Sequence, residues 1–153
     1  MSLSARIEQD YITAYKTRDS LRLSVLRLVK TAAKNMLVEL KRPGGELSDA
    51  ELRAILVKQG KQRQDSIEQF RAASRHDLAD KEEAELHILQ EYFPLPLSPE
   101  ELDAAINAVI AETGASSLRD MSRVMQKLTA EYAGRVDGKS LSNLVRARLT
   151  VPL

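Results

Sequence analysis

Seven residues near the C-terminal end of the chain combine glycine, basic and hydroxyl side chains, as phosphate-binding loops do. They read Gly-Arg-Val-Asp-Gly-Lys-Ser and span residues 134–140. A nucleotide-hydrolysing loop needs four residues between its first Gly and the Gly-Lys pair, and it follows a strand. Here the spacing is one residue short and the preceding segment has helical periodicity. We therefore expect no nucleotide hydrolysis. Two readings stay open: an RNA phosphate held by Arg135 and Lys139, or an ordinary turn between helices.

Other reactive side chains form no obvious catalytic set. Glu83 lies one helical turn before His87, one of two histidines in the chain. Two ligands do not make a structural metal site, so this spacing favours a surface ion pair. The acidic residues between positions 82 and 91 indicate a solvated face. The chain has no Cys, which excludes disulfides, thiolate zinc sites and cysteine nucleophiles. We expect no metal, no cofactor and no independent catalysis.

Basic residues recur at helical spacing in both halves of the chain. Residues 1–75 hold 15 Lys/Arg against 9 Asp/Glu, whereas residues 76–93 hold 1 against 6. This asymmetry can steer a charged partner, or the two segments can pair with each other. Rows of cations suit phosphates, and they equally suit a solvated surface. The RNA-binding candidates are Arg119, Arg123, Lys127, Arg135, Lys139, Lys30, Lys34 and Lys61. Aromatic residues make up only 4% of the chain, so we expect an RNA contact to read folded shape.

The elements that position these side chains are predicted to be helices throughout. Apolar residues recur at intervals of three and four, and the 43% hydrophobic content is mostly aliphatic. Ser48 with Glu51 forms a capping box that starts one helix, and Ser98 followed by Pro99 starts another. Asp77 is expected to cap a helix that begins near residue 76. The pattern predicts an all-α fold.

The run Pro-Leu-Pro-Leu at residues 94–97 is the predicted domain boundary, because proline cannot continue a helix. It separates an N-terminal helical domain, residues 1–94, from a small C-terminal three-helix domain, residues 98–153. The chain begins with no apolar signal region, and no stretch approaches the roughly 20 apolar residues of a membrane span. We therefore expect no membrane association and a cytoplasmic location.

A series of motifs across the chain resembles the GatB/YqeY family. The central signature lies in residues 61–70, Arg75 to Ala79, Glu82, Glu85-Leu86 and Glu91-Tyr92-Phe93-Pro94. Asp19 to Arg27 and Asp120 to Met125 fit the same pattern at its two ends. Ser122 departs from it, since the family usually has Gly there, a residue suited to close backbone approach. The resemblance implies a helical N-terminal unit and a three-helix C-terminal unit.

The resemblance also implies a function in tRNA handling. The chain is similar to the C-terminal region of the B subunit of the tRNA-dependent amidotransferase, where this region helps to hold the tRNA. We therefore predict a non-catalytic accessory module whose partner is tRNA or a tRNA-handling protein complex, with no DNA partner. Two alternatives stay open. One is a protein-interaction module without RNA binding, and the other is an amidotransferase-related protein, a carbon-nitrogen ligase with glutamine as amido donor.

Five polar residues within or beside the signature are predicted to form a structural network. Arg makes bidentate contacts with carboxylates and can join two helices in this way. A ligand site is the alternative reading of the same residues. The predicted network consists of Arg63, Ser66, Arg75, Asp77 and Glu82.

Overall fold

The computed structural model describes residues 1–150, and over this range it is helical with no strand. The all-α prediction is confirmed. The chain divides into two compact units, unit 1 (Met1–Phe93) and unit 2, which begins at Pro94. The last three residues of the predicted C-terminal domain, 151–153, lie outside the described residues.

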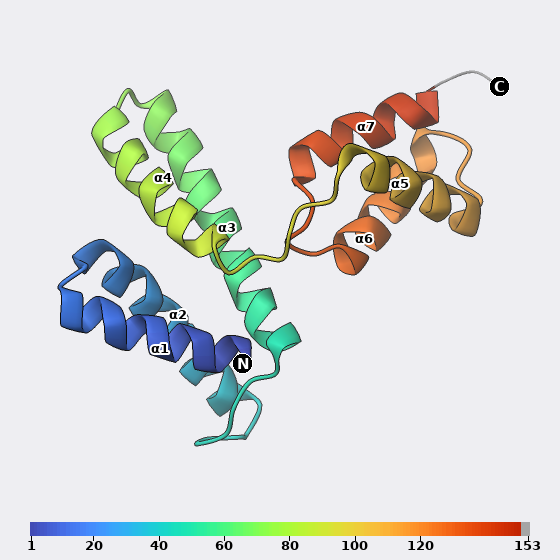
Figure 1. Ribbon diagram of the computed structural model, residues 1–153. Coiled ribbons are helices and arrows are strands. Elements are labelled where there is room, and N and C mark those ends of the chain that lie inside the picture. Colours follow the sequence, from blue (N-terminus) through green and yellow to red (C-terminus); the bar gives the residue numbers. More distant parts are fainter. Residues whose placement is uncertain (151–153) are drawn as a thin grey trace. The chain divides into compact units, whose positions relative to one another are not determined.

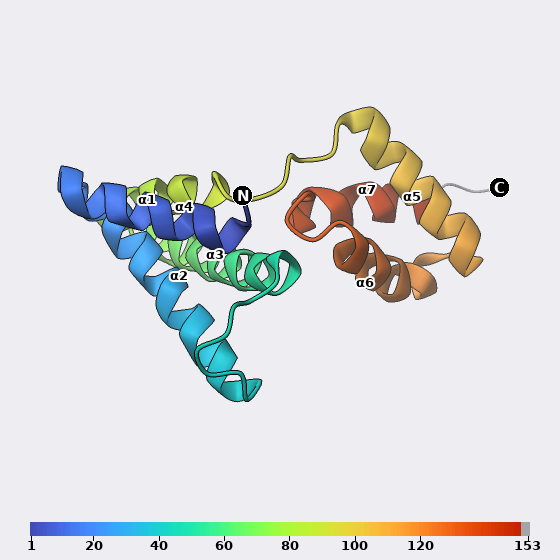
Figure 2. The ribbon, with the colours of Figure 1, turned by 60° about the horizontal axis from the view of Figure 1, so that its bottom comes forward.

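Unit 1 consists of two helical hairpins (Figure 1). Helices α1 (Leu3–Thr17) and α2 (Ser20–Glu39) form the first, and α3 (Asp49–Ala72) and α4 (His76–Gln90) form the second. In Figure 2 the C-terminal half of α2 projects away from the other three helices. The main core of unit 1 gathers aliphatic side chains from all four helices, among them Leu26, Leu56 and Leu89. A second, smaller core lies between α3 and α4 around Ile67 and Leu86.

Local sequence signals explain where most helices of unit 1 begin. Asp19 accepts a hydrogen bond from the backbone N–H of Arg22 and caps α2, and Ser48 with Glu51 forms the expected capping box of α3. The expected cap of α4 is wrong. Arg75 occupies the N-cap position without a side-chain cap, and Asp77 lies inside the first turn, where its carboxylate meets the Arg75 guanidinium instead. Because α4 begins at His76, the Asp77 carboxylate lies in the first turn of the helix, where it interacts favourably with the helix dipole.

Three turns of unit 1 are closed by residues other than glycine in the left-handed region. They are Arg18 (φ 59°), Lys41 (φ 57°) and Ser74 (φ 57°). Each follows the end of a helix, and the backbone N–H of Arg18 donates to Tyr15 at the end of α1. Gly60 has a different role. A Cβ there would lie 2.9 Å from the ring of Phe93, so the missing side chain lets that ring pack against α3.

Unit 2 contains α5 (Pro99–Thr113), a short 3₁₀ turn η1 (Leu118–Asp120), α6 (Met121–Glu131) and α7 (Gly138–Thr150). Ser98 and Glu101 form a capping box with Pro99 at the first helical position, as the sequence predicts. The core of unit 2 is built by Ile106, Val124, Leu128, Leu141 and Val145 and their neighbours. The segment before α5 is held by Arg135, whose side chain donates to the Leu95 carbonyl and whose carbonyl accepts from the Leu97 N–H.

Candidate functional site

The central signature builds a buried ion pair between α3 and α4. Arg63 and Glu85 are each only 7% exposed, and their side chains are in direct contact. Arg63 also donates to Glu82 at 3.1 Å. These charges lie between the two apolar cores of unit 1, because Leu56 and Leu89 belong to one core and Ile67 and Leu86 to the other. A one-turn slip of α3 against α4 would bury unpaired charges, so the pair fixes the register of this hairpin.

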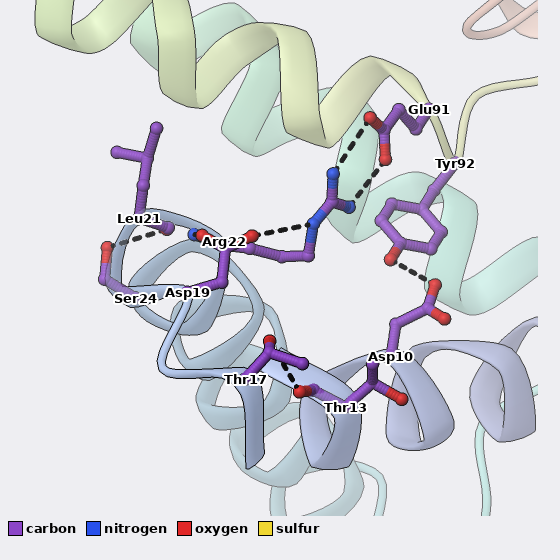
Figure 3. Close-up of polar contacts among 9 residues, drawn as sticks. All are labelled: Asp10, Thr13, Thr17, Asp19, Leu21, Arg22, Ser24, Glu91 and Tyr92. Atoms are coloured by element: carbon purple, nitrogen blue, oxygen red, sulfur yellow. Dashed lines mark hydrogen bonds and ion pairs between the residues drawn. The ribbon is translucent and has the colours of Figure 1, made fainter. Parts of the chain in front are cut away.

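A second polar cluster joins the Asp19 to Arg27 segment to Glu91 and Tyr92 of the central signature, as Figure 3 shows. Arg22 of α2 makes two contacts with the Glu91 carboxylate, at 2.6 and 3.0 Å, and also lies 3.6 Å from Asp19. The Tyr92 hydroxyl donates to Asp10 of α1 at 2.5 Å. Arg6 lies over the Tyr92 ring and donates to the Glu91 carbonyl. Together these contacts attach the end of α4 to both helices of the first hairpin.

The electrostatics of this cluster favour fixed charges rather than proton transfer. The Arg22 guanidinium, hydrogen-bonded to Glu91, lowers the pKa of that carboxyl, and Arg6 acts in the same direction. Burial raises the pKa of the Tyr92 hydroxyl, and the hydrogen bond to Asp10 raises it further. Glu91 therefore stays ionised and Tyr92 protonated at neutral pH. Both groups have partners within unit 1, and we interpret the cluster as a structural junction.

The Arg22 and Glu91 pair makes a pH-dependent contribution to stability. Because the folded pKa of Glu91 lies below 4.5, its value without the pairing, the contribution is complete above that pH and is lost as the pH falls through the folded pKa. We expect Glu91→Gln to be less stable than the parent at pH 7, and the difference to shrink towards pH 3. Urea titrations at both pH values, followed by circular dichroism, measure it. A difference that is constant with pH would contradict the pairing.

The five residues of the predicted structural network are divided among three places. Arg63 and Glu82 connect α3 to α4, as described above. Arg75 and Asp77 pair with each other at 3.2 Å on the exposed turn between these helices. Ser66 is half-buried and lines a groove beside α2. Sequence reasoning missed Glu85, although a signal exists: it lies four residues before buried Leu89, on the core-facing side of α4.

Two shallow grooves lie on unit 1. The larger, about 360 Å³, lies between α3 and α4 and is lined by polar side chains including Arg71, Glu83 and His87. Glu83 pairs there with Arg71 at 2.5 Å, not with His87 as its spacing predicts. The smaller, about 210 Å³, lies between Leu28 of α2 and polar residues of α3. Within residues 1–150 no three His, Cys, Asp or Glu side chains are grouped to hold a metal ion, and no helix there is long and apolar enough to cross a membrane.

The eight RNA-binding candidates differ in their surroundings. Lys30 lies 2.8 Å from Glu8 and over the ring of Tyr11. In unit 2, Arg123 pairs with Asp120, Lys127 with Glu112, and Arg135 with Glu101 at 3.8 Å. Four candidates are exposed and make no ion pair within the described part of the chain: Lys34, Lys61, Arg119 and Lys139. The last two belong to unit 2.

Helix α7 carries a basic face that the sequence reading only partly identified. The helix contains Lys139, Arg146 and Arg148 and no acidic residue. Leu141, Val145 and Leu149 face the core, and Arg148 turns to Asp103 and Asn107 of α5. One flank of the helix, next to its core-facing side and here called the α7 face, consists of Lys139, Ser142, Asn143, Arg146 and Thr150, and all of these are exposed except half-buried Ser142. Arg146 is not among the predicted RNA-binding candidates, which end at Lys139. Its spacing of seven residues from Lys139 is nevertheless a helical repeat, so the two side chains lie on the same side of α7.

Comparisons with known proteins give the family. The model of the family described as "Yqey-like protein" matches residues 4–149. A relative from Lachancea thermotolerans is 32% identical over 147 residues, which cover 95% of this chain and 78% of the relative. One from Kluyveromyces lactis is 30% identical over 145 residues, covering 94% and 74%, and one from Saccharomyces cerevisiae is 28% identical over 137 residues, covering 88% and 70%. All three are named "Altered inheritance of mitochondria protein 41, mitochondrial".

These names overturn one expectation. The predicted cytoplasmic location is wrong by this comparison, since the relatives are named as mitochondrial proteins. The lack of a long apolar stretch argues against a membrane span but does not distinguish one compartment from another, and this is why the sequence argument failed. The family assignment rests on a match over almost the whole chain. This protein belongs to the Yqey-like protein family.

Proposed function

We propose that this chain is a non-catalytic accessory module that binds folded RNA such as tRNA through the α7 face. The observation that carries the proposal is the composition of that face, which combines Lys139 and Arg146 with hydroxyl and amide side chains and has no carboxylate on its helix. Protein contacts to phosphates come mainly from Lys and Arg, together with Ser, Thr and Asn. A helix without acidic groups attracts a polyanion, and the carboxylate that precedes it, Asp137, accepts hydrogen bonds from Ser140.

Three further features support the proposal. Arg119 of η1 is exposed and makes no ion pair within residues 1–150, and η1 packs against α7. The paired cations Arg123 and Lys127 are held only by surface contacts, which are weak and can be exchanged for a phosphate. The third feature is the resemblance of the sequence motifs to the GatB/YqeY family, which implies a likeness to the tail of the B subunit of the tRNA-dependent amidotransferase, a region that helps to hold tRNA.

The test is a filter-binding titration of the full chain with total tRNA at about 50 and 200 mM salt. We expect binding at low salt that weakens steeply as salt rises. The double variant Lys139→Glu with Arg146→Glu removes two phosphate contacts, so its salt slope should be shallower by about 2. The matched control reverses two exposed cations of unit 1, Lys16→Glu with Lys81→Glu, and should leave the slope unchanged.

Two results would contradict the proposal. One is the absence of salt-dependent binding at micromolar protein. The other is an equal loss of affinity in the control, because net charge rather than the α7 face would then explain the binding. Circular dichroism of each variant confirms that the helices are retained.

A further inference from the structure

An exposed, uncharged row follows the length of α2 in unit 1. It consists of Ser24, Leu28, Thr31, Asn35 and Val38, and is here called the α2 row. Its spacings of four, three, four and three residues are those of the a and d positions in a coiled-coil seam. Leu28 is 54% exposed and Val38 61%, although α2 buries other aliphatic side chains completely. This spacing, together with the exposed Leu28 and Val38, is typical of a helix face that contacts another helix.

Gln59, one of the side chains that line the groove beside Leu28, carries an unsatisfied hydrogen-bond acceptor. The Gln59 side-chain N–H donates to the Leu28 carbonyl at 3.2 Å, which fixes the orientation of the amide. The other end of this amide, Oε1, is buried and has no donor in the described chain. Gln62 and Ser66 line the same groove, which is about 210 Å³. A buried acceptor without a partner is unfavourable, and a bound molecule whose donor group reached Oε1 would remove that cost.

Three exposed cations lie beside the α2 row, and one exposed carboxylate, Glu39, follows Val38 at the end of α2. Arg27 and Lys34 lie on α2 one residue before Leu28 and Asn35, and both are exposed without an ion pair within residues 1–150. Lys58, next to Gln59 on α3, is likewise exposed and makes no ion pair in that range. Two copies of this surface would repel each other, because each copy would bring its own Arg27, Lys34 and Lys58 to the contact. An acidic partner would complement this surface.

We propose that the α2 row binds an amphipathic helix of another protein, one with acidic residues beside its apolar seam and a hydrogen-bond donor for Gln59. The seam offers only two large apolar residues, so the complex is a transient one. The partner helix lies against α2 and the edge of α3, with its aliphatic side chains on Leu28 and Val38. Its carboxylates meet Arg27, Lys34 and Lys58. This surface belongs to unit 1 and is independent of the α7 face.

The test uses two synthetic helices as probes and the full chain as receptor. Both are 21-residue peptides with Leu at a and d and one Asn at a, and they carry either Glu or Lys at the flanking e and g positions. Like charges at e and g keep each peptide from pairing with itself. Fluorescence anisotropy of the labelled peptides gives the affinities. We expect the Glu peptide to bind about tenfold tighter than the Lys peptide.

Matched variants distinguish specific binding at the α2 row from nonspecific binding of the peptides elsewhere on the protein. Leu28→Asp should weaken the Glu peptide at least about tenfold, as loss of a central anchor does. The control Leu118→Asp places the same charge on a Leu of unit 2 that is 49% exposed, and should change nothing. Arg27→Glu with Lys34→Glu should reverse the preference and favour the Lys peptide. That reversal is the decisive support, since it requires contact at the border of the α2 row.

Several outcomes would overturn the proposal. They are binding of neither peptide, equal binding of both, and equal effects of Leu28→Asp and Leu118→Asp. A fourth is loss of tRNA affinity in the Arg27→Glu, Lys34→Glu variant without any peptide binding, which would assign these cations to RNA. Because the α7 variants do not touch unit 1, failure here leaves the tRNA titration unaffected, and the reverse also holds.

Discussion

Arg63→Met is expected to destabilise unit 1 by about 3–5 kcal/mol, the cost of removing one partner from a buried ion pair. Methionine keeps most of the side-chain length, so the loss comes from the charge rather than from a cavity. Glu85, which is 7% exposed in the parent protein and lies between two apolar cores, would lose its cation. Hydrogen exchange of the α3 and α4 amides measures the free energy of opening for this hairpin directly.

The double variant Arg63→Met with Glu85→Leu is the control. Replacing both charges by apolar groups of similar size is often neutral or stabilising, so we expect most of the loss to be recovered. Glu82, whose side chain is 26% exposed, can turn to water when Arg63 is gone. If the double variant were as unstable as the single one, the damage would come from packing and not from the uncompensated charge. Amides of α7 in unit 2 should exchange at the parent rate in both variants.

Tyr92→Ala should cost about 3–5 kcal/mol, as the removal of a buried aromatic ring does. Tyr92 is 3% exposed, packs in the main core of unit 1 and carries Arg6 against its ring (Figure 3 shows the Tyr92 ring and its hydroxyl contact). The residue lies at the end of α4, so its loss releases the junction with α1 as well. Urea unfolding followed by circular dichroism gives the change in free energy.

Tyr92→Phe separates the ring from the hydroxyl. It keeps the ring and the Arg6 contact and removes only the hydrogen bond to Asp10. Since Asp10 is half-buried and water can reach it, the expected loss is about 1 kcal/mol. Equal losses in the two variants would show that the hydrogen bond, not the ring, holds this junction.

Signals that lie close together in the sequence predicted the fold well. Ser48 with Glu51 and Ser98 with Glu101 are capping boxes in the structure, because each depends only on residues three positions apart. Asp77 shows the limit of such reasoning. A carboxylate near a helix start can act as a cap or lie within the first turn. Which of the two occurs depends on the residue at which the preceding turn ends.

Contacts between distant residues could not be predicted in the same way. Arg22 meets Glu91 across 69 positions and Tyr92 meets Asp10 across 82, and no spacing rule connects them. The family motifs include Arg22, Glu91 and Tyr92 but not Asp10, and they do not indicate which of these residues are in contact. The α7 face shows another gap. Lys139 was identified, but Arg146 was not, since an exposed cation becomes informative only when the core-facing side of its helix is known.

Glycine substitutions at the three left-handed residues Arg18, Lys41 and Ser74 would increase the stability of this protein. Each holds a conformation that costs a side chain of order 1 kcal/mol and that glycine adopts freely. All three are exposed, so glycine there would alter no core and neither of the two proposed binding surfaces. A lineage that loses stability elsewhere, for instance by acquiring a new contact residue, could regain part of it at these turns, and the fold is to that extent tolerant of further evolution.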